Sequence, residues 1–272
     1  MAFASVMVPL DLGAYSARRL KLAVELAERF GSRLIGVAAR EPLPTRLYGR
    51  GAYINPQSVE LAYACMAEDM AKVEELFHRA TEPHNHAEWR SARMNPMAFL
   101  MRQARTADIV VITRYHQDGV EDWCSYVEPG ELILNVGRPV LVAPPDVDHV
   151  SAQRIIVAWK DTREARRAIS DSLPFLKMAA EVFILSVGEE TGLEEARDVA
   201  DHLKLHGLNC VPLLRQASSA GVAAVILTLA GEKQADLIVA GAYGHSRMRE
   251  MIFGSVTRQL LESASVCCLM SH

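Results

Sequence analysis

The sequence lacks the long apolar runs and the leader that would direct it into or across a membrane. None of its apolar runs reaches the roughly 18 residues that a membrane-spanning helix needs. Its first residues contain neither the basic segment nor the small-residue cleavage site of a secretory signal. We therefore expect a cytoplasmic protein with no membrane segment.

Positive charge is also scarce. The chain has 29 Lys and Arg against 33 Asp and Glu, a formal net charge of -4, and no dense basic run. A nucleic-acid binder needs a basic face to neutralise phosphates, so we expect no nucleic-acid partner. The basic residues that do cluster alternate with acids around a predicted helix start, which is typical of a solvated face. They are Arg154, Lys160, Arg163, Arg166 and Arg167.

Cysteine is sparse, and its spacing fits no known cysteine-based site. The five cysteines are odd in number and show neither a CxxC pair nor the Cys/His spacing of a zinc site. Cys267 and Cys268 lie in an apolar run, which predicts buried free thiols. Cys124, beside Trp123 in a polar segment, is the alternative candidate for a reactive thiol.

One group of residues offers a possible metal site. His84 and His86, together with Glu88, would place both imidazoles on one face of a strand. A polar edge strand explains the same pattern without a metal. The sequence also lacks a nucleophile–base arrangement such as GxSxG.

The chain repeats itself, and this repeat determines the predicted domain organisation. Residues 106–111 (Thr-Ala-Asp-Ile-Val-Val) match residues 234–239 (Gln-Ala-Asp-Leu-Ile-Val). Each half opens and closes with an apolar β-type run. The segment 144–148 (Pro-Pro-Asp-Val-Asp) suits a boundary, because prolines do not fit a central strand. We predict one domain over 1–146 and a second over 151–272.

Within each half, apolar β-type runs alternate with amphipathic helical patterns. The strands are almost continuously apolar, as sheets covered on both faces require. Alternation without hairpin signals predicts parallel βαβ units. The fold class is therefore α/β, with two tandem doubly wound five-stranded parallel-sheet domains of the Rossmann-like type. In the second half we predict strands at 154–159, 181–187, 208–214, 235–240 and 266–271, and helices at about 162–178, 191–206, 218–232 and 254–264.

The segment after the fourth strand of the second half carries the strongest functional signal. Gly241 and Gly244 end a predicted strand, and after nine further residues Gly254 and Ser255 begin a predicted helix. We call these four residues the glycine motif. Glycines let the backbone approach an anion and adopt positive φ, so successive N–H groups can form an anion-binding nest. The N-terminus of a helix attracts the same charge. The motif therefore predicts a phosphate site.

Side chains near the glycine motif add hydrogen-bond donors for phosphate. They are His245, Ser246, Arg247, Arg249, Ser255 and Thr257. The alternative is that the glycines only turn the chain and cap the helix. The motif is not a Walker loop, because no GKS/T follows, and it is not GxGxxG.

The glycine motif resembles the G-x2-G-x9-G-S/T pattern of the universal stress protein family. Val256 and Thr257 are similar to the family as well, and so is 157–165 after the first strand. The resemblance covers nearly the whole chain as two tandem copies. It implies the family's five-stranded fold, binding of ATP or a related nucleotide, and paired domains joined through their last strands, within one chain or between two.

One departure from the family concerns recognition of the adenine base. Family members that bind ATP usually place an Asp at the end of the first strand to meet the adenine. That position is Asp11 in the first half but Lys160 in the second. Adenine recognition in the second half would then rest on the backbone near Ala158 and Val187. Lys160 could reach a phosphate or simply be solvated.

The first half lacks the glycine motif. Thr113 and His116 stand where Gly241 and Gly244 stand in the second half, and Glu131 replaces Ser255. Acids in a phosphate cradle repel the ligand, so we predict an inactive first site in which Asp11 serves as a helix cap. The acids of this stretch are Asp118, Glu121, Asp122, Glu128 and Glu131. The segment 41–56 is interpreted as a partner surface or a flexible insertion.

The sequence indicates binding rather than catalysis. Apart from Ser255 and Thr257 it offers no obvious magnesium ligand near the glycine motif, and Asp161 and Glu164 suit helix capping. We expect a stress-response regulatory or protective module that binds ATP, ADP or AMP, with Mg as an option, and an unknown protein partner. A nucleotide-free dimerising scaffold of the same fold is the alternative. A pyrophosphatase-type enzyme is a third reading, but its SGGxDS loop is absent.

Overall fold

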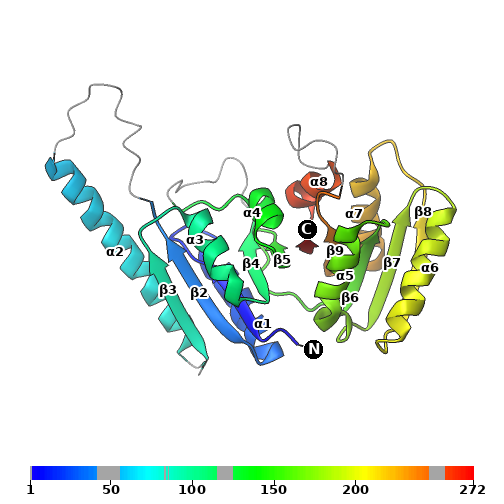
Figure 1. Cartoon of the computed structure of the whole chain (residues 1–272), viewed down its shortest axis with the longest axis horizontal. Coiled ribbons are helices and arrows are strands. Elements are labelled where there is room, and N and C mark those ends of the chain that lie inside the picture. The colour runs from blue at the N-terminus through cyan, green and yellow to red at the C-terminus, as the bar shows by residue number, and fades with distance from the viewer. Residues whose placement is uncertain (1, 42–55, 83, 85, 115–124, 245–254) are drawn as a thin grey trace.

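The computed structural model describes residues 2–41, 56–82, 84, 86–114, 125–244 and 255–272. Ten strands form one sheet in the order β3-β2-β1-β4-β5-β10-β9-β6-β7-β8 (Figure 1). The strands are β1 (Ser5–Pro9), β2 (Arg33–Ala39), β3 (Ala87–Ala92), β4 (Ile109–Thr113), β5 (Val140–Ala143), β6 (Arg154–Trp159), β7 (Glu181–Val187), β8 (Cys210–Arg215), β9 (Leu237–Gly241) and β10 (Cys267–Ser271).

Helices cover both faces of this sheet. They are α1 (Ser16–Phe30), α2 (Pro56–Thr81), α3 (Pro96–Gln103), α4 (Pro129–Asn135), α5 (Arg163–Leu176), α6 (Thr191–Lys204), α7 (Val222–Lys233) and α8 (Ser255–Ser263), with a 3-10 turn at Ala104–Thr106. Side chains of α1, α2, α5 and α6 pack into one core cluster, and those of α3, α4, α7 and α8 into another. Successive strand residues alternate between the two, as Val6 and Val8 do against Met7. The strands are apolar throughout because both of their faces are buried.

The two halves have the same strand order. β3-β2-β1-β4-β5 in the first half corresponds to β8-β7-β6-β9-β10 in the second. Strands within each half pair in parallel, so the predicted fold class is confirmed. The strands predicted at 154–159 and 181–187 have the predicted bounds, and the other strands and helices of the second half differ only at their ends. The domain bounds 1–146 and 151–272 stay a prediction.

The halves join through their last strands. β10 pairs antiparallel with β5, with Leu269 opposite Leu141, Cys268 opposite Val142 and Met270 opposite Val140. In Figure 1 the first half (blue to green) lies on the left and the second (green to red) on the right. The resemblance left open whether such pairing lies within one chain or between two; here it lies within the chain.

A carboxylate at the start of the fourth strand of each half anchors the start of the first strand. Asp108 Oδ2 accepts hydrogen bonds from the amides of Ala4 and Ser5, at 2.7 and 3.0 Å. Asp236 accepts from the amides of Gln153 and Arg154, at 2.9 and 3.1 Å. These are the aspartates of the repeated sequence, so the repeat preserves a structural contact.

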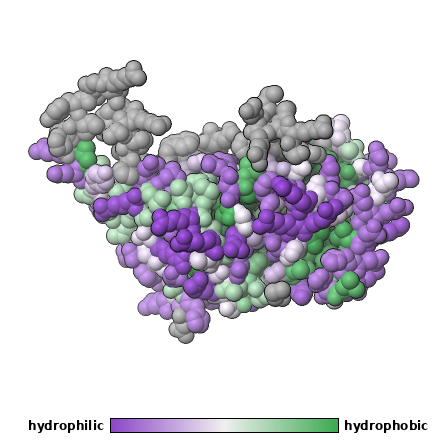
Figure 2. Space-filling model, viewed as in Figure 1, coloured by the Kyte–Doolittle hydropathy of each residue, from purple (hydrophilic) through white to green (hydrophobic). Residues whose placement is uncertain are grey.

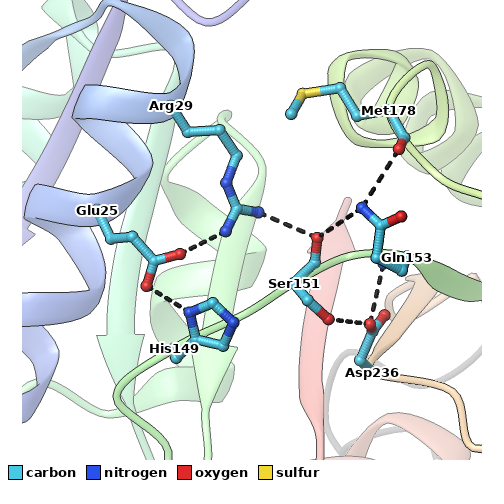
Figure 3. A network of polar contacts seen from close by, with 7 residues as sticks. All are labelled: Glu25, Arg29, His149, Ser151, Gln153, Met178 and Asp236. Atoms are coloured by element: carbon cyan, nitrogen blue, oxygen red, sulfur yellow. Dashed lines mark hydrogen bonds and ion pairs between the residues drawn. The ribbon is translucent and has the colours of Figure 1, made fainter.

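The segment between the halves is bound on both sides (Figure 3). Arg29 of α1 donates to the carbonyl of Ser151 at 3.2 Å, and the Ser151 hydroxyl contacts Asp236. Glu25 links Arg29 to His149, whose Nδ1 lies 2.6 Å from its carboxylate. The segment 149–151, which follows the predicted boundary, therefore contacts both halves.

The histidine pattern does not form a metal site. His84 and His86 precede β3 and do not lie on it, which corrects the strand placement. His84 Nε2 is 3.3 Å from Glu28 Oε1, whereas Glu88 pairs with Arg90 at 2.7 Å. Within the described ranges, no three His, Cys, Asp or Glu side chains could hold a metal ion together. β3 lies at the edge of the sheet, as the alternative interpretation expected.

The cysteines of the last strand are buried free thiols, as predicted. Burial raises the pKa of Cys268 to about 12 and also raises that of Cys267, so neither favours the thiolate. Cys124 lies outside the described residues.

Figure 2 shows a mainly hydrophilic face with small hydrophobic groups between the polar residues. The exposed apolar side chains are scattered, with Leu61 on α2 and Leu205 after α6 the most exposed. None of the helices in the described segments combines the length and the apolar character that a membrane crossing requires.

Candidate functional site

The strand order of the second half reverses between β6 and β9. From β6 the sheet continues to β7, and from β9 it continues to β10 in the opposite direction. In such sheets, ligands bind beyond the carboxyl ends of the two strands at the reversal. Ala158 lies opposite Ala240 in register, so Lys160 and Gly241 follow at the same edge. Val187 ends the neighbouring strand β7 at this edge too. The structure therefore brings these predicted residues together.

Gly241 is required by packing against α5. A Cβ on Gly241 would lie 2.5 Å from the backbone nitrogen of Ala165, in the first turn of that helix. A Cβ on Gly244 would lie 3.1 Å from Glu164 Oε2 and 3.3 Å from Thr162. The first is a clash with backbone, whereas the second is a tight contact with side chains. The end of β9 thus reaches the N-terminus of α5 closely only because these positions lack side chains.

Positive φ does not occur at the two glycines, contrary to the expectation from sequence. It occurs between them, at Tyr243, with a φ of 61°. A residue with a Cβ is rarely found in this region. The loop therefore obtains its turn from Tyr243, and the glycines contribute close approach instead.

The two ends of the predicted phosphate loop are bound to each other. The amide of Tyr243 donates to Thr257 Oγ1 at 3.4 Å, and Thr257 is buried in the first turn of α8. Ser255 begins α8, as the glycine motif predicted, and Val256 is half-buried beside it. Five predicted residues lie outside the described ranges: His245, Ser246, Arg247, Arg249 and Gly254.

Glu164 places a buried carboxylate beside the loop. Only 4% of the residue is exposed, and it pairs with Arg163, whose side chain is 80% exposed. Thr162, not Glu164, caps α5: its Oγ1 accepts from the amide of Ala165 at 3.2 Å. Glu164 is therefore not the N-cap residue, but it lies in the first turn of α5, where its carboxylate interacts with its own backbone amide. Burial is the largest single effect and raises the pKa of Glu164. The hydrogen bond from Arg163, the backbone amide of Glu164 itself and the electrostatic attraction of Arg163 and His272 together outweigh it, so the net pKa is lowered.

Replacing Glu164 with Gln is expected to change how stability depends on pH. Because the folded-state pKa lies below the ordinary value of 4.5, the ionised carboxylate stabilises the protein above that pH, and this contribution is lost as pH falls through the folded pKa. Arg163 is exposed, so solvent screening limits the contribution to about 1 kcal/mol or less. Melting temperatures of wild type and Glu164→Gln should converge between pH 7 and pH 3. A constant difference across this range would contradict the assignment.

The basic cluster on α5 has the acid-paired surface that the sequence predicted. Arg166 pairs with Asp161, and Arg167 Nε lies 3.9 Å from Asp171 Oδ2. Asp161 is thus engaged by an arginine. The Lys160 side chain is exposed at the carboxyl end of β6, a position compatible with either of its two interpretations.

The corresponding edge of the first half is filled by its own ion pair. Arg19 Nη2 lies 2.7 Å from Asp11 Oδ2, with side chains 2% and 9% exposed, and Arg19 Nε donates to the carbonyl of Pro9 at 2.7 Å. The adjoining cavity, with Phe99 and Thr113 among its lining residues, has a volume of about 20 Å³, enough for about one water molecule. The first site is thus small and already charge-paired.

Asp11 is not a helix cap. The N-cap of α1 is Tyr15, and Asp11 Oδ1 instead accepts from the amide of Gly13 at 2.7 Å. Glu128 does cap a helix: its carboxylate accepts from the amide of Glu131 at the start of α4. The segment carrying His116, Asp118, Glu121 and Asp122, and most of the segment 41–56, lie outside the described residues.

Sequence reasoning missed three features of these edges. An Arg in an amphipathic helix is usually exposed, so nothing in the sequence indicated that Arg19 is buried. Glu164 was assigned to capping because it stands in a first helical turn. Tyr243 gave no signal at all, because bulky residues rarely adopt its conformation.

Comparisons with known proteins agree with this fold. Residues 218–272 match the sequence pattern described as the universal stress protein family. No curated protein matches the chain. A universal stress protein from Archaeoglobus fulgidus DSM 4304 has a TM-score of 0.73 at 14% identity, covering 98% of this chain and 98% of its own. A putative universal stress protein from Pseudomonas aeruginosa UCBPP-PA14 has a TM-score of 0.63 at 14% identity, covering 99% and 93%.

At these identities the solved structures establish the fold, and the match over residues 218–272 adds the sequence pattern that contains the glycine motif. Residues 218–272 thus match the universal stress protein family in sequence, and nearly the whole chain has the fold of solved universal stress proteins.

Proposed function

We propose that the second half binds an adenine nucleotide, with the phosphates held by backbone amides between Gly241 and Thr257. The observation that carries this proposal is the approach of Gly241 and Gly244 to the N-terminus of α5, at the point where the strand order reverses. Two helix N-termini, those of α5 and α8, begin at this edge, and both favour negative charge.

The described residues offer hydrogen-bond donors to a phosphate chain, but their charges suit it only partly. The Thr257 hydroxyl accepts from Tyr243 and can still donate its own hydrogen. Glu164 is negative near Gly244, but Arg163 offsets that charge. A magnesium ion, if bound with ATP, would take its ligands mainly from the phosphates and water, because Asp161 and Glu164 both pair with arginines.

We infer binding without turnover, in a cytoplasmic stress-response module whose occupancy alters the surface offered to a protein partner. This inference rests on the family resemblance. We propose that ATP, ADP or AMP would bind at this same site.

A direct test is Gly244→Asp. The new carboxylate would lie next to Glu164 and face the bound phosphates, so we expect ATP, ADP and AMP to bind at least about tenfold more weakly, a loss of about 1.4 kcal/mol. Isothermal titration calorimetry measures this, with a steady-state assay in Mg²⁺ for turnover. Gly231→Asp is the matched control, because Gly231 is exposed on α7 with open space around its Cβ position.

The rival function is a nucleotide-free scaffold. One observation limits it: β5 and β10, the strands that would join two chains, already pair within this one. Wild-type protein that shows no binding and no thermal shift with millimolar ATP, ADP or AMP would favour the scaffold. Equal binding by Gly244→Asp and Gly231→Asp would move the site elsewhere.

A further inference from the structure

Tyr243 stands out in the loop for its backbone conformation. Its φ of 61° lies in the left-handed region, which a residue with a Cβ adopts when its surroundings impose it. Glycine would adopt the same conformation without strain. The tyrosine side chain must therefore make contacts that offset this strain.

Those contacts are extensive. The ring is half-buried and packs against the core cluster on the α3, α4, α7 and α8 face, to which Val127 and Leu132 of the first half also belong. The ring centroid lies 6.3 Å from that of His272, in an edge-on arrangement. Burial, and secondly the nearby carboxylate of Glu128 in the first half, raise the pKa of the Tyr243 phenol. The side chain is thus held where the two halves meet.

The residue before Tyr243 is bound to the last strand. The amide of Ala242 donates to the carbonyl of Ser271 at 2.9 Å, and His272 Nδ1 lies 2.9 Å from the carbonyl of Ala242. Since β10 pairs with β5, the start of the loop is connected through one strand to the first half.

Two arginines complete the connection. Arg167 of α5 donates to the carbonyl of His272 at 3.0 Å and to the carbonyl of Gly137, in the first half, at 3.2 Å. Arg114, which follows β4 of the first half, donates to the carbonyl of Leu261 in α8 at 3.1 Å. The helix after the loop therefore contacts the first half directly, and the strand before the loop, β9, is connected to the first half through β10.

We propose that Tyr243 is a positioning residue that fixes the first amides of the phosphate loop against the first half, so that the half without a glycine motif supports the site of the other. The proposal rests on the proposed function for its ligand, and on the contacts of Tyr243 for its geometry. A loop fixed before binding loses less conformational freedom when a phosphate arrives.

Tyr243→Leu tests this. Leucine has a Cβ, so the left-handed backbone conformation stays as strained as before, but the aromatic ring is lost. We expect ATP to bind about tenfold more weakly, and the amides of Tyr243 and Thr257 to exchange hydrogen faster without nucleotide. Tyr243→Phe retains the ring and should restore both measurements to near wild type. Leu203→Ala is the control for a general loss of stability. Leu203 is a buried residue of α6, away from the loop, so its replacement should leave both the ATP affinity and the loop exchange unchanged within about twofold.

The two readouts separate the proposals. If loop exchange in Tyr243→Leu matches that in Leu203→Ala, Tyr243 does not position the loop, whatever the affinity. If loop exchange rises in Tyr243→Leu alone while wild type binds no ATP, the positioning role stands and the proposed function falls. Equal ATP affinity in wild type and Tyr243→Leu would also overturn the proposal.

Discussion

Replacing Asp11 with Ala is expected to lower the free energy of unfolding by about 3–5 kcal/mol, because it leaves the Arg19 guanidinium charged and buried without its carboxylate. Arg19 is among the largest fully buried side chains of the described chain, and the adjoining cavity has room for about one water molecule, so water replaces the lost carboxylate only in part. Urea unfolding followed by circular dichroism measures the change.

The same pair gives a sharper comparison. In the double variant Asp11→Ala, Arg19→Met both charges are removed and an apolar side chain fills the space, so we expect it to be more stable than Asp11→Ala alone. Asp201→Ala is the control: its partner Lys204 and the aspartate itself are both exposed, and such pairs contribute about 0–1 kcal/mol. If the free energy of unfolding of Asp11→Ala lay within about 1 kcal/mol of the wild-type value, the buried charge of Arg19 would not depend on Asp11.

The same pair shows where sequence reasoning stops. The strand positions and the parallel fold class followed from apolar runs and their alternation with helices, because these patterns depend on local chemistry and short connections. Arg19 lies in a helix whose pattern puts charges outside, and only the close approach of β1 explains its burial. Asp11 was recognised as a position of interest, but its partner could not be known without the fold.

The sequence predicted where the glycine motif lies in the fold, but not what the residues around it contact. The spacing of the glycine motif identified the end of β9 and the start of α8 correctly. It gave no reason for Gly241, which lies against the backbone of Ala165 from a helix far away in sequence. It also missed Tyr243, whose amide donates to Thr257 of α8 and whose ring lies beside that of His272, after β10. Contacts of this kind arise between distant segments, so a single sequence does not record them.

The repeat illustrates the reverse case, in which the sequence showed a feature and the structure supplied its cause. Asp236 accepts hydrogen bonds from the amides of Gln153 and Arg154 and contacts the hydroxyl of Ser151 (Figure 3). One carboxylate thus satisfies the first donors of β6 and the segment that leads into it. Asp108 does the same for β1.

Asp236→Ala is therefore expected to cost about 2–4 kcal/mol of unfolding free energy, since hydrogen bonds to a charged group contribute about 1.5–3 kcal/mol and Asp236 is only half-buried. Asp236→Asn keeps one acceptor oxygen and should lose less. Asp108→Ala should behave alike in the first half. Because the two sites share no hydrogen-bond partner, the double alanine variant should lose the sum of the two changes to within about 0.5 kcal/mol.

The control for Asp108 and Asp236 comes from the segment that connects the two halves. Asp146 pairs with Arg18 at 2.8 Å, but its side chain is 92% exposed, so Asp146→Ala should change stability by less than about 1 kcal/mol. Chemical denaturation of the wild type and of all five variants compares their free energies of unfolding directly. If Asp236→Ala proved as mild as Asp146→Ala, water would be replacing the carboxylate at the start of β6, and the repeated aspartate would need another explanation than the anchoring of each half's first strand.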